Sequence, residues 1–295
     1  MAEEPGRPGR LAVIGAGTMG RGIAHAAAVA GLATTVQDVA PAALQRARRA
    51  IEEIVAKGVE LGKLEAEERD AALARIAFVE DLAAAVQDAD LVIEAVPERM
   101  AIKLELFAAL DRVAPPDAIL ATNTSSLSVT EMAAATNRAG RCIGLHFFNP
   151  VQKMKLLEIV RGLETEPATV AAAVATARRL NKEPVVIRES PGFITSRMNA
   201  LIGNEAFALL AEGVASAADI DKAMKLGLNH PMGPFELVDL VGLDTRLHIL
   251  EYLYRTLGEK YRPHPLLVQY VRAGRLGRKS GRGVYEYPQQ AAATL

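Results

Sequence analysis

The sequence has little of several features that mark particular protein classes. It contains one cysteine, Cys142, and no tryptophan, so no internal disulfide can form and a reducing compartment such as the cytoplasm is expected. No apolar run approaches the ~18 residues that a membrane-spanning helix needs. The 34 lysines and arginines nearly balance the 35 aspartates and glutamates, and no basic block is present. We therefore expect neither nucleic acid nor a membrane as the main partner.

Two further absences narrow the chemistry. There is no cysteine–histidine cluster and no His-Glu-x-x-His sequence, so no metal site is predicted. Residues 1–10 lack an apolar core and contain Glu3 and Glu4, so we expect no signal or transit peptide there. What is present is a chain of 295 residues that is 50% hydrophobic, which is enough for about two domains with sizeable cores.

Short apolar runs alternate with alanine-rich helical segments over the first two-thirds of the chain. We expect strands at residues 11–15, 33–38, 77–79, 90–95, 118–122, 141–147, 155–160 and 183–187. Helices are expected between the early strands, at residues 19–30, 41–57, 67–75 and 98–112. Alternation of this kind predicts an α/β fold with a doubly wound, mostly parallel sheet of the Rossmann type.

After residue 187 the pattern becomes helical. A polar segment containing Ser190, Pro191 and Gly192 separates the two patterns, with Ser190 as the expected N-cap of the next helix and Pro191 as its first residue. We therefore expect a dinucleotide-binding domain at residues 1–188 and an all-helical domain at 189–295. Because the linker is short, the two domains are expected to pack around a cleft.

The clearest local motif is a glycine-rich turn after the first expected strand. Gly15, Gly17 and Gly20 form G-x-G-x-x-G, in which the glycines permit a tight turn, close approach of a pyrophosphate and close helix–strand packing. Asp38 ends the second expected strand, where a carboxylate binds ribose hydroxyls and repels a 2′-phosphate. The motif predicts NAD rather than NADP; the alternative is a plain glycine-rich turn with an exposed aspartate.

Two ionisable residues stand out in apolar strands. His146 ends the strand at 141–147, at the sheet edge where ligands bind in doubly wound folds. Glu158 lies within an apolar run, where an unpaired carboxylate would be costly. A pair of the two would supply the base of a secondary-alcohol dehydrogenase; the alternative is a structural salt bridge from Glu158 to an arginine or lysine. His25, among alanines, is expected to be a hydrogen-bonded structural histidine.

Small polar residues follow the strand at 118–122. Asn123, Ser125 and Ser126 lie where they could bind a substrate oxygen or the nicotinamide amide. The alternative is a turn that caps the next helix.

Six motifs in order give the chain a family likeness. They are Gly15-Ala-Gly-Thr-Met-Gly20, Asp90-Leu-Val-Ile-Glu-Ala-Val, Thr122-Asn-Thr-Ser-Ser-Leu, His146-Phe-Phe-Asn-Pro, Ser190-Pro-Gly-Phe-Ile and Pro231-Met-Gly-Pro-Phe-Glu-Leu-Val-Asp. On these, the chain resembles the L-3-hydroxyacyl-CoA dehydrogenase family, most closely its bacterial 3-hydroxybutyryl-CoA branch. The resemblance implies reversible, NAD-dependent oxidation of (S)-3-hydroxyacyl-CoA in fatty-acid or butanoate metabolism, by a homodimer formed through the helical domain.

The resemblance also implies residue roles. His146 would be the general base and Glu158 its partner, Ser125 would contact the substrate oxygen, and Asn149 would contact nicotinamide and substrate. The implied cofactor contacts are Gly15, Gly17, Thr18, Met19, Gly20, Asp38, Glu98, Lys103, Asn123, Asn149 and Lys279. Lys57 and Lys63 are candidates for binding the coenzyme A phosphates of the acyl-CoA thioester.

One position departs from the family pattern. Ser196 stands where the family often has a substrate-binding asparagine, and Asn199, one helical turn further on, could take over that role. Two other functions remain open at this stage: a dehydrogenase of a free hydroxy or sugar acid, and a non-catalytic structural relative.

Overall fold

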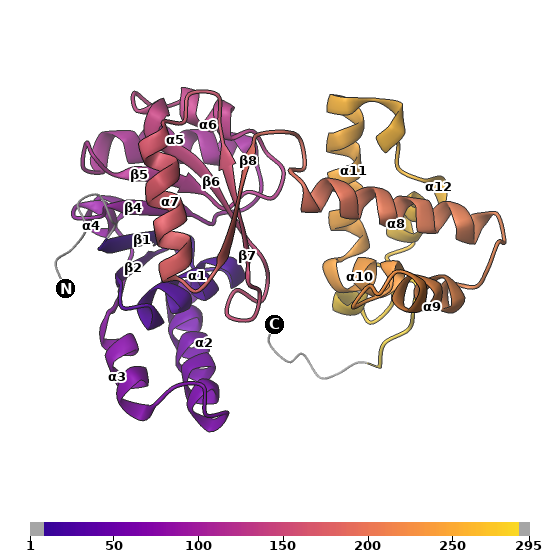
Figure 1. The fold of residues 1–295 in the computed structure, drawn as a ribbon, viewed down its shortest axis with the longest axis horizontal. Coiled ribbons are helices and arrows are strands. Elements are labelled where there is room, and N and C mark those ends of the chain that lie inside the picture. The colour runs from indigo at the N-terminus through magenta and orange to yellow at the C-terminus, as the bar shows by residue number, and fades with distance from the viewer. Residues whose placement is uncertain (1–8, 289–295) are drawn as a thin grey trace. The chain divides into compact units, whose positions relative to one another are not determined.

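The computed structural model describes residues 9–288, which divide into two compact units at Glu189 and Ser190 (Figure 1). Most of the N-terminal segment in which no targeting peptide is expected lies outside the described residues. Among the described helices, none is both long and apolar enough to span a membrane.

The first unit is built on an eight-stranded sheet with the order β3-β2-β1-β4-β5-β6-β7-β8. Strands β1 to β6 are parallel, β7 is antiparallel to β6, and β8 is parallel to β7. The strands are β1 (Arg10–Ile14), β2 (Ala33–Gln37), β3 (Ile76–Val79), β4 (Leu91–Glu94), β5 (Ile119–Thr122), β6 (Cys142–Phe147), β7 (Leu156–Arg161) and β8 (Glu183–Arg188). The predicted doubly wound, mostly parallel sheet is confirmed.

Helices cover both faces of this sheet. They are α1 (Thr18–Val29), α2 (Pro41–Glu60), α3 (Ala66–Ala74), α4 (Leu82–Val86), α5 (Met100–Val113), α6 (Val129–Ala134), the short η1 (Ala139–Arg141) and α7 (Pro167–Arg179). Figure 1 shows α2 and α3 side by side at one end of the unit.

Alternate residues of each central strand serve two separate cores. In β1, Leu11 and Val13 pack with α1, α2 and α7, whereas Ala12 and Ile14 pack with α4, α5 and α6. Because successive side chains of a strand point to opposite faces, a continuous apolar run serves both layers at once.

The second unit is a helical bundle. Its elements are α8 (Thr195–Ala211), α9 (Ala217–Gly227), α10 (Pro234–Val241), α11 (Leu243–Leu257), η2 (Glu259–Tyr261), α12 (Pro265–Arg272) and η3 (Arg278–Ser280). Isolated bridges join Arg282 to Gly277 and to Glu286. The core forms around Phe207 and Phe235, whose rings meet edge-on at 5.2 Å. The expected helical second domain is therefore present.

The start of α8 differs from the expectation. The helix begins at Thr195, and Ser190 is not its N-cap. Gly192 (φ 73°) and Phe193 (φ 52°) adopt left-handed backbone angles, so the chain turns once more before the helix starts. The Ser190 hydroxyl instead accepts a hydrogen bond from Arg197 at 3.1 Å.

Candidate active site

The glycine-rich turn has the geometry that its sequence predicts. Gly15 has φ +104°, and a side chain there would approach the carbonyl oxygen of Ala95 to 2.6 Å. A side chain on Gly20 would overlap the carbonyl oxygen of Gly15, so glycine permits the close contact between strand β1 and helix α1. These two positions fix the turn between strand and helix.

The surface of this turn fits a dinucleotide phosphate. Gly17 is the N-cap of α1 and provides no side chain to cap the helix. The first turn of the helix, which begins with Thr18 and Met19, contains no acidic residue. A Cβ on Gly17 would meet nothing within 4 Å. The N–H groups and partial positive charge at the start of α1 are therefore accessible to an anion.

Asp38 lies directly after β2 and is tied to the same turn. Its Oδ2 accepts a hydrogen bond from the Ala16 amide at 2.9 Å, and its Oδ1 accepts one from Ala40 at 3.0 Å. Each carboxylate oxygen has a second lone pair, so the group can also accept ribose hydroxyls. The neighbouring Val39 is 85% exposed and offers no cation for a 2′-phosphate.

His146 and Glu158 meet across the antiparallel strands β6 and β7. They are direct partners in the register of the two strands, and Nδ1 of His146 lies 2.6 Å from Oε2 of Glu158. The side chains are 8% and 1% exposed. The structure thus shows the pair that the sequence predicted. Its catalytic role stays a prediction.

The segment after β5 lies beside this pair. Asn123 accepts a hydrogen bond from the Phe147 amide at 3.0 Å through Oδ1, which joins the ends of β5 and β6. Ser125 is half-buried, and Asn149 is exposed just beyond β6. Because β1 to β6 are parallel, Gly15, Asn123 and His146 all lie at the carboxyl edge of the sheet, where doubly wound folds bind ligands.

Lys103 lies deeper than a direct cofactor contact would suggest. Its side chain is 1% exposed and its Nζ lies 2.6 Å from Glu94 and 3.2 Å from Glu98. The sequence reasoning missed Glu94, although the signal was the one that singled out Glu158: a carboxylate ending an otherwise apolar strand.

The remaining predicted site residues lie apart from this edge or in the second unit. Lys57 pairs with Glu60 at 2.7 Å on the exposed end of α2, and Lys63 is exposed just beyond it. In the second unit, Lys279 pairs with Asp244 at 2.6 Å. Ser196 and Asn199 are half-buried on α8. Within residues 9–288 no cluster of His, Cys, Asp and Glu side chains could hold a metal ion.

His25 differs from its sequence interpretation. It is 7% exposed on α1, but neither ring nitrogen has a hydrogen-bond partner among the described residues. Burial, and then the positive charge of Lys182, lower its pKa to about 4. The expectation of a hydrogen-bonded structural histidine is wrong, because a helix face rich in alanine supplies no side-chain partner.

Comparison with known proteins assigns both units. Residues 10–190 match the profile of the 3-hydroxyacyl-CoA dehydrogenase NAD-binding domain, and residues 192–287 match that of the 3-hydroxyacyl-CoA dehydrogenase C-terminal domain. The chain belongs to the 3-hydroxyacyl-CoA dehydrogenase family. The resemblance inferred from the motifs is confirmed, and NAD is the cofactor of this dehydrogenase.

Relatives of the same family match along nearly the whole chain. A probable 3-hydroxybutyryl-CoA dehydrogenase of Bacillus subtilis is 47% identical over 96% of this chain and 99% of its own length. The mitochondrial hydroxyacyl-coenzyme A dehydrogenase of Homo sapiens is 41% identical over 94% of this chain and 90% of its own. The solved (S)-3-hydroxybutyryl-CoA dehydrogenase PaaH1 of Ralstonia eutropha superposes with a TM-score of 0.93 at 43% identity, covering 96% of this chain and 100% of that one.

Proposed function

We propose that this dehydrogenase oxidises (S)-3-hydroxyacyl-CoA thioesters reversibly to 3-oxoacyl-CoA, with 3-hydroxybutyryl-CoA as the preferred substrate, in fatty-acid or butanoate metabolism. The observation that carries the proposal is the buried contact between His146 and Glu158 at the carboxyl edge of the sheet, on the same edge as the glycine-rich turn. Relatives with 44–47% identity that are named 3-hydroxybutyryl-CoA dehydrogenases support the choice of substrate.

The roles of the site residues follow from this geometry. When bound, NAD accepts the hydride that leaves the C3 atom of the substrate. Nδ1 of His146 lies 2.6 Å from Glu158, and an ionised carboxylate only accepts hydrogen bonds, so we assign the ring proton to Nδ1. Nε2 is then the atom that takes the proton of the substrate hydroxyl. The carboxylate of Glu158 holds the imidazole ring in place and stabilises the positive charge that the ring gains.

Ser125 and Asn149 complete the proposed chemistry. The Ser125 hydroxyl donates a hydrogen bond to the substrate oxygen as that oxygen becomes a carbonyl, and the Asn149 amide orients nicotinamide and substrate. In the second unit, Ser196 and Asn199 are proposed to bind the thioester, and Lys279 to bind the cofactor. Lys57 and Lys63, at the exposed end of α2, are proposed to bind the coenzyme A phosphates by charge attraction.

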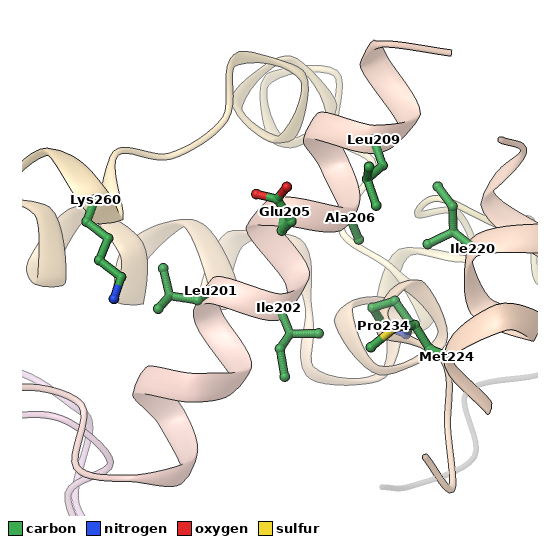
Figure 2. Close-up of a pocket in the computed structure, with 9 residues that line it drawn as sticks. All are labelled: Leu201, Ile202, Glu205, Ala206, Leu209, Ile220, Met224, Pro234 and Lys260. Atoms are coloured by element: carbon green, nitrogen blue, oxygen red, sulfur yellow. The ribbon is translucent and has the colours of Figure 1, made fainter. Parts of the chain in front are cut away.

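A homodimer through the helical unit is part of the proposal. A largely apolar pocket of about 450 Å³ lies on this unit. Figure 2 shows its lining residues, which are Leu201, Ile202, Glu205, Ala206, Leu209, Ile220, Met224, Pro234 and Lys260. Leu226 and Leu228, at the end of α9, are 78% and 63% exposed. Large exposed apolar side chains of this kind favour association. The proposed compartment is the cytoplasm.

Kinetics with a series of substrates test the activity. Rates are measured for C4 to C16 (S)-3-hydroxyacyl-CoA thioesters with NAD and with NADP, alongside free 3-hydroxybutyrate and sugar acids. We expect the highest kcat/KM for the C4 thioester with NAD, and His146→Gln is expected to lower kcat by ~10²–10⁴-fold while NAD still binds. Faster turnover of a free acid would favour a dehydrogenase of free hydroxy or sugar acids, and no turnover at all would favour a non-catalytic structural relative.

A further inference from the structure

A buried charged cluster joins the ends of β4 and β5 to helix α5. Glu94 and Lys103 are 0% and 1% exposed. Glu94 Oε1 accepts hydrogen bonds from Lys103 Nζ at 2.6 Å and from the Val96 amide at 2.8 Å. Its Oε2 accepts one from the Thr122 hydroxyl at 2.6 Å. A buried carboxylate with three donors is a fixed anchor for the groups that it binds.

The same lysine reaches a second carboxylate nearer the surface. Lys103 Nζ lies 3.2 Å from Oε2 of Glu98, whose side chain is 35% exposed. The other oxygen of Glu98 accepts hydrogen bonds from the Thr124 hydroxyl at 2.5 Å and from the Ser125 backbone amide at 2.8 Å. An uninterrupted series of polar contacts therefore runs from the interior of the sheet to the backbone of Ser125.

We propose that Glu94 and Lys103 are positioning residues that place the Ser125 hydroxyl through Glu98. Lys103 balances two carboxylates that would otherwise repel one another. Without it, Glu98 swings away from Lys103 and Glu94 and releases the amide of Ser125. The inference rests on the proposed role of Ser125 in the oxidation of 3-hydroxyacyl-CoA.

A double-mutant cycle with Ser125→Ala tests the proposal. We expect Lys103→Met to lower kcat about 10–100-fold, because a displacement of about 1 Å in an active site costs up to ~10²-fold. In the Ser125→Ala background, the same substitution should lower kcat less than about threefold, because the group that it positions is already gone. Equal losses in both backgrounds would overturn the proposal, as would an unchanged kcat of Lys103→Met.

A second variant and a structural readout guard against misfolding and against failure of the proposed activity. Glu94→Gln removes the anchor charge with a smaller change in shape, and should reproduce the pattern at lower amplitude. Hydrogen exchange of the segment 122–128 should lose protection in both variants but not in Glu105→Gln, an exposed control on the same helix α5. This readout needs no substrate. Unchanged protection overturns the positioning role, whereas lost protection without turnover of any thioester overturns only the proposed function.

Discussion

His25, buried on α1 without a hydrogen-bond partner in the part of the chain that the structure describes, gives this protein a specific sensitivity to acid. A histidine titrates near pH 6.5 in an unfolded chain, whereas burial and the charge of Lys182 lower the pKa of His25 to about 4 in the folded protein. Between these two values the unfolded chain binds a proton that the folded chain does not, so the free energy of unfolding falls as the pH falls. Above about pH 6.5 His25 is neutral in both states and does not lower the free energy of unfolding. The loss of stability begins near that pH and grows down to about pH 4.

The size of the effect follows from the two pKa values. One pH unit of pKa difference corresponds to about 1.4 kcal/mol, so His25 lowers the free energy of unfolding by about 2 kcal/mol at pH 5 and about 3 kcal/mol at pH 4. This loss is a large fraction of the ~5–15 kcal/mol that stabilises a typical domain.

Urea unfolding at pH values from 7.5 to 4 measures the effect. We expect His25→Leu to remove this part of the pH dependence, so that the difference from the wild type grows toward acid by the amounts given above. His248→Leu, at an exposed position on α11, is the matched control and should leave the pH dependence close to that of the wild type. Parallel pH profiles for the wild type and His25→Leu would refute the reasoning.

Three further predictions rest on other buried groups. Arg246 is 1% exposed, its Nε and Nη2 have no partner among the described residues, and burial lowers its pKa to about 10. Arg246→Met should therefore raise the free energy of unfolding, measured in urea, by about 1–4 kcal/mol. A loss of stability would contradict this. Burial raises the pKa of Cys142 to about 11, so thiol reagents should label it only after denaturation; rapid labelling of the native protein would count against this. Gly20→Ala would overlap the carbonyl oxygen of Gly15 and should weaken NAD binding more than tenfold by calorimetry, so unchanged affinity would argue against the close contact.

The sheet and the His146–Glu158 pair were predictable because each leaves a local mark. Apolar runs bounded by turns mark the strands, and a carboxylate such as Glu158 inside such a run needs a partner. The antiparallel direction of β7 could not be predicted in this way, because an apolar run has the same sequence pattern in a parallel and in an antiparallel strand.

Other features depend on contacts that no short pattern encodes. Ser190 followed by Pro191 is a good helix start by sequence, but the left-handed angle of Phe193 arises from the surrounding structure and delays the helix. The burial of Lys103 depends on how α5 packs beside the ends of β4 and β5, so its sequence alone could not distinguish a surface contact from an interior ion pair.

The register between β6 and β7 decides which parts of this site can be altered. His146 faces Glu158 because the two residues are paired within a backbone ladder, and a slip of one residue would turn every side chain of β7 to the other face. Leu157 or Ile159, which belong to the core, would then stand opposite the histidine. The connecting segment at residues 148–155 is constrained as well, because Val151 is 2% exposed in the same core. The buried Lys182 also donates hydrogen bonds to the carbonyl oxygens of Val151 and Met154. Redesign of this region should therefore keep the length of the β6–β7 connection and replace only its exposed side chains, such as Lys153 and Met154, so that the contact between His146 and Glu158 is preserved.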